Sequence, residues 1–293
     1  MKLLTAILLT TILAAVALSA AACAAADQPA LLNARVETRS AAAGLEKTLE
    51  PIERGQAGTA WVGYAVPVIP GEHDMCCLNS PGDYRHSPNC CGGCRLEGQN
   101  QRTFMGTNSD CARLEPSREF FVFLRVEQGQ VEKVRAFSAN CEIDAAGVTL
   151  YWLTDVKPAE SVALLASLAE EHSGQAVAAL AMHADPSATD ALARLARSGR
   201  SPKVRSDALF WLAQKAGDKV AGVITEAIQR DPDTQVKKKA VFAVSQMPDG
   251  EGVPVLIQVV KNNRNPVVRK EAMFWLGQSH DPRALDFIAS ILR

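Results

Sequence analysis

The sequence predicts a two-part protein: a small N-terminal α+β domain with a Cys-rich insertion, followed by a C-terminal α-solenoid of helical hairpins. Two observations lead to this fold class. Segments with one shared pattern begin at Ser201, Asp233 and Asn265, each start 32 residues after the last. Upstream of them, short alternating segments typical of strands surround a stretch rich in Gly, Asn, Ser, Pro and Cys. A fixed period of this size indicates stacked helical pairs that bury their apolar faces against one another.

The same observations set the expected boundaries. We expect a signal peptide over residues 1–26 and an α+β domain over 27–156, with the Cys-rich loop at 70–116. The repeats are expected over 157–293. At 293 residues and 47% apolar composition, the chain is long enough for two domains.

Each repeated segment is predicted to be a helix with its own start signal. Ser201, Asp233 and Asn265 are N-cap residues. Pro202 and Pro266 stand at the first helical position, where a missing N–H does no harm.

Equivalent positions in the copies carry equivalent residues. In the repeated segments the aligned sets are Val204, Val236 and Val268, then Ala208, Ala240 and Ala272, then Phe210, Phe242 and Phe274, then Gln214, Gln246 and Gln278. Between the copies the same spacing recurs at Leu192, Ile224, Leu256 and Ile288. Each unit is therefore predicted to contain two helices.

This pattern resembles the HEAT family, in its short form with a Val-Arg-x-x-Ala-x-x-x-Leu second helix, as found in phycobilisome-lyase-type repeats. The resemblance covers residues 157–293, with three strong copies and a degenerate one that includes residues 175–183. It implies a curved solenoid whose second helices line the ligand-holding side. Chromophore attachment, which the lyase-type comparison raises, fits poorly because the match is confined to the repeat scaffold.

The N-terminus resembles a secretory signal. Met1 and Lys2 precede an apolar run to about Ala22, and the small residues 24–26 end it before Asp27. We therefore expect a periplasmic or secreted protein. Cys23 leaves the alternative of an envelope lipoprotein, in which lipidation at that residue would be the only membrane attachment.

Strands are predicted in the first part at 34–38, 59–68, 119–126, 131–138 and 147–153. A helix capped by Ser40 is expected to run to about residue 53. The turn at 127–130 joins two of these strands as a hairpin, and the sheet is expected to be mainly antiparallel.

The cysteines of the mature chain are predicted to form disulfides. The candidates are Cys76, Cys77, Cys90, Cys91, Cys94, Cys111 and Cys141. An exported loop with few apolar residues is commonly stapled in this way, and the connectivity cannot be read from the sequence. Cys141 is expected to tie the insertion to the sheet.

Two other chemistries remain open for the insertion. His73, Cys76, His86, Cys91 and Cys94 could supply four zinc ligands, but an oxidising compartment competes for the thiolates. Cys91 and Cys94 could form a redox pair, although two glycines between them are a poor helix start. We predict no metal and no cofactor.

No catalytic motif is legible, and we predict a non-enzymatic protein. His183 and His280 fall at expected helix ends, where a solvated or capping role is common. The net charge of −1 gives no generic attraction to nucleic acid.

A partner-binding surface is predicted on the second helices. Its residues are Phe210, Phe242, Phe274, Gln214, Gln246 and Gln278. Stacked apolar rings on a solvent-facing slot would mark a protein-binding stripe, and the alternative is that neighbouring helices cover them. Trp211 and Trp275 are expected to pack between helices.

A second series, Arg205, Lys237 and Arg269, lies four residues after each N-cap. In HEAT-like families matching positions form a polar ladder between repeats, and we expect that structural role here. The alternative is a basic ridge that steers an acidic partner.

Together these features predict an exported, non-catalytic scaffold or adaptor that binds a protein or peptide on the solenoid. The alternative is a metal- or redox-responsive envelope sensor that uses the Cys-rich insertion.

Overall fold

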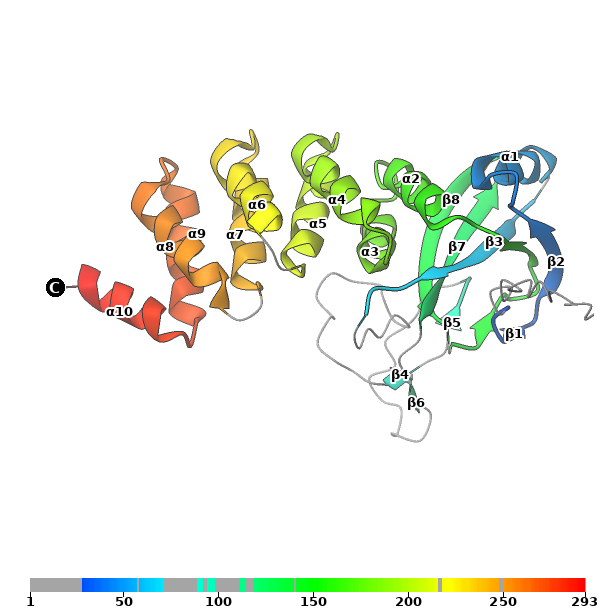
Figure 1. The fold of residues 1–293 in the computed structure, drawn as a ribbon, viewed down its shortest axis with the longest axis horizontal. Coiled ribbons are helices and arrows are strands. Elements are labelled where there is room, and N and C mark those ends of the chain that lie inside the picture. Colours follow the sequence, from blue (N-terminus) through cyan, green and yellow to red (C-terminus); the bar gives the residue numbers. More distant parts are fainter. Residues whose placement is uncertain are drawn as a thin grey trace, which may run out of the picture.

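The structure is a computed structural model, and it describes residues 28–56, 58–70, 89–91, 94–97, 111–113, 118–139, 141–215, 218–247 and 250–292. A mixed sheet lies at one end of the molecule, and a row of helices runs from it to the C-terminus (Figure 1). The predicted two-part layout is present. The predicted signal peptide, Cys23 and most of the insertion lie outside the described residues.

The larger sheet contains parallel and antiparallel strands in the order β2-β10-β3-β7-β8. Its strands are β2 (Arg35–Ser40), β10 (Thr149–Thr154), β3 (Ala60–Pro67), β7 (Glu119–Glu127) and β8 (Gln130–Ser138). β10 is parallel to both β2 and β3, so the prediction of a mainly antiparallel sheet is wrong for these strands. Helix α1 (Leu45–Gly55) carries the chain back between β2 and β3, which therefore run in one direction with β10 between them.

The predicted hairpin between β7 and β8 is confirmed. Gln128 and Gly129 at its turn have φ angles of 52° and 80°. Two successive positive φ angles are the signature of a type I′ turn, whose twist matches that of paired strands. This turn makes β7 and β8 the pair that local sequence fixes most directly.

Ser40 does not cap α1, contrary to the prediction. The helix begins after Gly44, and the Ser40 hydroxyl instead donates to Asp155 Oδ2 at 2.6 Å, joining the ends of β2 and β10. A carboxylate from another helix takes the capping role, because the Leu45 N–H donates to Glu160 Oε2 at 2.7 Å. This hydrogen bond holds the pKa of Glu160 below its usual range.

The two faces of the sheet bury different cores. One face turns Val62, Tyr64 and Val122 toward the helices. The other presents Trp61, Phe121, Phe123, Phe137 and Trp152, which pack with Leu96 and Ile143. Alternation along each strand separates the two sets, as the twofold side-chain period requires.

Short strands lie beyond the second face. β1 (Leu31–Leu32), β9 (Ile143–Asp144) and β5 (Cys94–Arg95) form one small sheet. β4 (Asn89–Cys91) pairs with β6 (Cys111–Arg113) in another. Part of the predicted loop therefore forms strands, and one of them, β5, pairs with β9 of the domain.

The C-terminal part is helical throughout its described residues. Its helices are α2 (Pro158–Leu168), α3 (Ser173–Met182), α4 (Ser187–Ser198), α5 (Pro202–Ala213), α6 (Asp218–Arg230), α7 (Thr234–Ser245), α8 (Gly252–Asn262), α9 (Pro266–Gln278) and α10 (Pro282–Ile291). The predicted N-caps are confirmed, since Ser201, Asp233 and Asn265 each accept a backbone N–H from the first turn of α5, α7 and α9. Among the described helices, none has the length and apolar character needed to cross a membrane.

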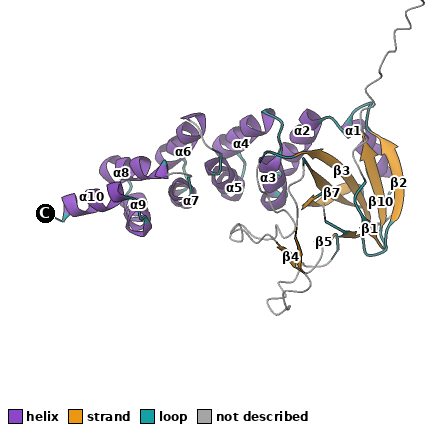
Figure 2. Cartoon of the chain, turned by 60° about the horizontal axis from the view of Figure 1, so that its bottom comes forward, coloured by secondary structure: helices purple, strands orange, loops and turns teal. Residues whose placement is uncertain are grey.

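These helices pack as pairs in two rows (Figure 2). The second helices α3, α5, α7 and α9 contact one another in succession. In the row of first helices, α4 packs against α2 and α6, whereas α6 and α8 approach each other less closely. Asn263 at the end of α8 still donates its Nδ2 to Ile228 O of α6 at 3.3 Å. The wider step in this row therefore lies between α6 and α8, since α8 packs against α10.

The first helical pair also covers the sheet. Leu165 and Val177 belong to the same continuous core as Tyr64, and the buried Ser161 hydroxyl donates to the Tyr64 hydroxyl at 3.2 Å. The chain after β3 adds backbone hydrogen bonds to the α3–α4 loop, with Ile69 N–H to Met182 O at 2.9 Å and Ala184 N–H to Pro67 O at 2.9 Å. Sheet and helices therefore share one interior.

His183 lies at this junction and is buried, although the sequence suggested a solvated or capping residue. Its side chain is 1% exposed, and neither ring nitrogen has a hydrogen-bond partner. The ring stands edge-on to Phe120, with centroids 5.8 Å apart. Burial lowers the pKa of His183 to about 4, against a smaller opposing effect of Asp185.

We expect this histidine to make the fold sensitive to acid. It is neutral in the folded chain, whereas the unfolded chain binds a proton below pH 6.5. The stability that depends on a neutral His183 is therefore fully present above pH 6.5 and is lost as the pH falls toward 4. This loss amounts to roughly 3 kcal/mol in unfolding free energy. Urea unfolding of the wild type and of His183→Phe across this pH range measures how the unfolding free energy of each protein depends on pH. Equal pH slopes for the two proteins would contradict the assignment.

Candidate partner-binding surface

The three predicted phenylalanines lie on the successive second helices α5, α7 and α9. Phe210 and Phe242 are stacked, with ring centroids 6.2 Å apart and planes 9° from parallel. Phe242 then contacts Trp275 at 5.0 Å, and Trp275 contacts Phe274 at 5.1 Å. The repeat thus produces one continuous line of aromatic rings, which we call the aromatic stripe (Phe210, Phe242, Trp275 and Phe274).

The stripe becomes more exposed toward the C-terminus. Phe210 and Phe242 are half-buried, and Phe210 packs against the main core. Phe274 is 54% exposed. The two alternatives considered from the sequence therefore apply to different rings: partial cover at Phe210 and Phe242, and an open apolar surface at Phe274.

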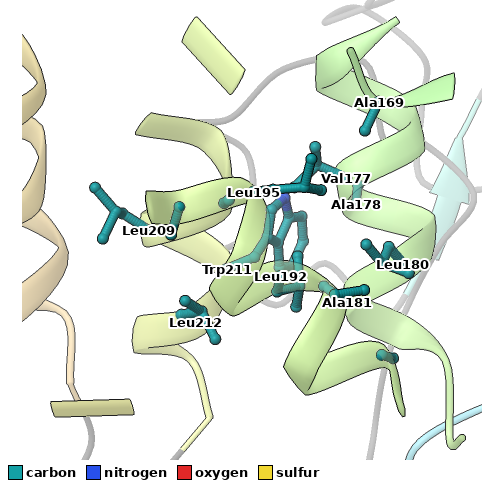
Figure 3. Packing of buried hydrophobic residues seen from close by; sticks show 14 of the residues in the cluster. Ala169, Val177, Ala178, Leu180, Ala181, Leu192, Leu195, Leu209, Trp211 and Leu212 are labelled. Carbon is teal, nitrogen blue, oxygen red and sulfur yellow. The ribbon is translucent and has the colours of Figure 1, made fainter. Parts of the chain in front are cut away.

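The two tryptophans differ. Trp211 is buried, and Figure 3 places it between α5 and the residues Val177 and Leu180 of α3. Trp275 is half-buried; its Nε1 donates to Glu271 at 3.1 Å while its ring joins the stripe. Trp275 thus contributes to the surface that the sequence assigned to the phenylalanines and glutamines.

Gln214, Gln246 and Gln278 are exposed at the C-terminal ends of α5, α7 and α9. Gln246 Nε2 donates to the adjacent Ser245 Oγ at 3.1 Å. Each glutamine follows its phenylalanine by four residues, about one helical turn, and this spacing sets the amides along the border of the stripe in every repeat. An amide both donates and accepts, so this border can hydrogen-bond a peptide backbone.

The cationic series caps helix ends. Lys237 Nζ donates to Gln229 O at 2.9 Å, and Arg269 donates to Asn263 O at 2.8 Å. Both carbonyls belong to the C-terminal end of the preceding first helix, where positive charge is favourable. Both contacts stay within one helical pair, α6–α7 or α8–α9, so at Lys237 and Arg269 the series does not form the predicted ladder between repeats.

Arg205 goes further and joins two repeats. Its Nε and second terminal nitrogen donate to the two Asp231 carboxylate oxygens at 2.7 and 3.1 Å, and its third contact is to Gly199 O at 3.0 Å. Arg205 and Asp231 are 9% and 8% exposed. The bidentate pair raises the pKa of Arg205 and fixes the α6–α7 pair against the α4–α5 pair.

The cysteines within the described residues lie in or just beside the short strands β4, β5, β6 and β9. Cys94 and Cys141 form a disulfide with Cα atoms 6.1 Å apart, and both are buried in the second core. In the backbone register, Cys91 stands opposite Cys111 across β4 and β6, and Cys90 stands beside it. Cys76 and Cys77 lie outside the described residues.

A polar cluster that the sequence did not reveal holds the insertion beside this disulfide. Glu97 Oε1 accepts from Trp61 Nε1 and from Arg125 Nε, each at 2.9 Å. Burial alone would raise the pKa of Glu97, but the Arg125 and Trp61 hydrogen bonds outweigh it and hold the pKa below its usual range. Buried Arg135 donates to Leu96 O at 3.0 Å. These partners lie far apart in the chain, and no local motif connects them.

The zinc hypothesis falls mainly on residues that the structure leaves undescribed. His73, Cys76 and His86 are among them. Within the described ranges, no group of three or more His, Cys, Asp or Glu side chains could hold a metal ion.

Comparison with known proteins supports the predicted repeats in the C-terminal part of the chain. Residues 222–293 match the family model for HEAT repeats. A search of curated proteins found no match to this chain. The C-terminal part therefore carries HEAT-like repeats, a class of module that commonly mediates protein interactions.

We expect Arg205→Ala to be far more damaging than Arg269→Ala. The first leaves the buried Asp231 carboxylate without its bidentate partner, at a cost of about 3–5 kcal/mol in unfolding free energy. The second removes contacts to helix-end carbonyls from a half-buried position, at about 1 kcal/mol. Equilibrium denaturation of both variants measures the difference, and similar losses would contradict the interlayer role of Arg205.

The Cys94–Cys141 link should be strongly stabilising. Because the two residues are 47 apart, we expect the double variant Cys94→Ser, Cys141→Ser to lose about 3–4 kcal/mol in unfolding free energy. Denaturant unfolding measures the loss, and a non-reducing peptide map of the wild type identifies the pair. A map that pairs either cysteine with another residue would refute the link.

Proposed function

We propose that this protein is an exported, non-catalytic scaffold or adaptor that binds a protein or peptide partner along α5, α7 and α9. We also propose that the helical pairs continue as a short α-solenoid of the phycobilisome-lyase-type HEAT form. The observation that carries the function is the aromatic stripe, which runs unbroken across three repeats and opens to solvent at Phe274.

The stripe suits a segment with apolar side chains. Exposed Phe274 offers an anchor surface, and half-buried Phe210 and Phe242 stay rigid because they stack on each other. Rigid aromatic groups supply contact area at low entropic cost. The bordering glutamines would bind the polar backbone of the same segment, so apolar and polar recognition lie side by side.

The alternative, a metal- or redox-responsive envelope sensor, draws on the cysteines of the insertion. Regulatory disulfides are commonly exposed, whereas Cys94 and Cys141 are 1% and 5% exposed. Their burial favours a stapling role for this pair, so the scaffold is the function we prefer.

The test compares Phe274→Ser with Leu285→Ser. Both residues are exposed, at 54% and 58%, but Leu285 lies on α10 outside the stripe. We expect Phe274→Ser to lower capture of a partner from bacterial envelope extract by roughly tenfold, because a binding anchor contributes more than 1 kcal/mol. The Leu285→Ser protein should capture as the wild type does, and both should melt within a few degrees of it.

Equal capture by Phe274→Ser and the wild type would contradict the proposal. Phe210→Ser and Phe242→Ser are less decisive, because each half-buried ring also contributes about 1–3 kcal/mol to folding. If the triple variant Phe210→Ser, Phe242→Ser, Phe274→Ser unfolds while Phe274→Ser alone binds normally, the rings serve the core alone.

A further inference from the structure

Two ion pairs join the α4–α5 layer to the α6–α7 layer. Arg205 holds Asp231 as described above, and Arg197 Nε donates to Glu226 Oε2 at 2.9 Å between α4 and α6. The two carboxylates thus come from the later layer, and each faces an arginine of the earlier one.

The next interface has lost both carboxylates. Moving 32 residues along the chain, Arg205 and Asp231 become Lys237 and Asn263. The local geometry is otherwise retained: Asp231 Oδ1 accepts the Asp233 N–H at 2.9 Å, and Asn263 Oδ1 accepts the Asn265 N–H at the same distance. The equivalents of Arg197 and Glu226 are Gln229 and Gln258. Amides therefore stand at both carboxylate positions.

A cavity lies beside the two substituted carboxylate positions, Gln258 and Asn263. It has a volume of about 730 Å³ and lies between α6 and α8, the neighbouring first helices that approach each other less closely. Gln258 and Asn263, the two substituted residues, both line it. The volume is typical of a site for a small molecule or a few peptide residues.

The lining carries positive charge without acidic residues. Arg230, Lys237 and Arg264 contribute cations, and no Asp or Glu is among the residues that line the cavity. Arg230 has a distant ion pair with Glu226 at 3.9 Å, and Lys237 is bound to a carbonyl oxygen. Arg264 is exposed, and its main-chain oxygen accepts from Arg269. Among the lining amides, Asn263 Nδ2 donates to Ile228 O at 3.3 Å and Asn262 Nδ2 to Gln258 Oε1 at 2.8 Å. The cations are therefore the groups that suit this site to an oxyanion.

We propose that this cavity binds carboxylate groups, supplied by the Asp or Glu side chains of an acidic peptide segment. Such a ligand would replace the two carboxylates that the earlier interface provides from its own chain. None of the six residues predicted for partner binding lines the cavity, so the site is independent of the aromatic stripe.

Calorimetric titration of the full chain tests the proposal, with a capped Glu/Asp hexapeptide as the probe. Its Gln/Asn counterpart serves as the neutral peptide control. We expect saturable binding of the acidic peptide at low salt and none of the neutral one. Arg264→Gln should weaken binding roughly tenfold, the equivalent of one charge-assisted contact. Arg194→Gln removes the same charge from an exposed position on α4 and should leave affinity within about twofold.

The sharpest variant restores the two carboxylates of the earlier interface. Gln258→Glu with Asn263→Asp returns both carboxylates in nearly the same volume, and it should abolish peptide binding while the protein still melts cooperatively. Equal losses in Arg264→Gln and Arg194→Gln, or binding that survives the double variant, would overturn the proposal.

Two further probes distinguish the source of the anion. Succinate that binds as tightly as the peptide would keep the carboxylate site but assign it to a free dicarboxylic acid. Phosphate that binds while the peptide and succinate do not would overturn the carboxylate assignment.

Discussion

The helical half of the molecule depends on close contact between successive second helices. Val204, Val236 and Val268 are at most 1% exposed, and Ala208, Ala240 and Ala272 are fully buried. Alanine at this position allows neighbouring helices to approach, and valine fills the space beside it. Because one layer supplies the surface that the next must cover, the apolar face of each pair is satisfied only in the array. The aromatic stripe, the cationic series and the cavity all take their spacing from this contact.

The sheet end shows how such an array can begin. A first layer has no preceding pair to cover it, and here the five-stranded sheet takes that place through Tyr64 and the residues around it. Backbone hydrogen bonds between the end of β3 and the α3–α4 loop fix the orientation of the two parts. The α2–α3 pair thus belongs to both halves. The burial of His183 follows from this arrangement.

Sequence reasoning succeeded where the signal was local or periodic. The N-caps at Ser201, Asp233 and Asn265 and the hairpin turn at Gln128-Gly129 could be predicted because each depends on a few adjacent residues. The parallel pairing of β10 could not, since its partners lie about a hundred residues away. The capping of α1 by Glu160 and the Glu97–Arg125 contact also join distant segments. Within the stripe, the periodicity identified the phenylalanines but missed Trp275, whose ring fills the gap between two of them.

The unequal interfaces along the array have a mechanical consequence. Arg205 and Asp231 clamp one boundary with a buried bidentate contact. The following boundary has neutral amides and a hollow between its first helices, and its ion pair, Lys238 with Glu271 at 3.1 Å, joins its second helices instead. Stiffness therefore differs from layer to layer. Bending should concentrate between α6 and α8, so the curvature of the C-terminal repeats is the part of the molecule most easily adjusted to the shape of whatever it holds.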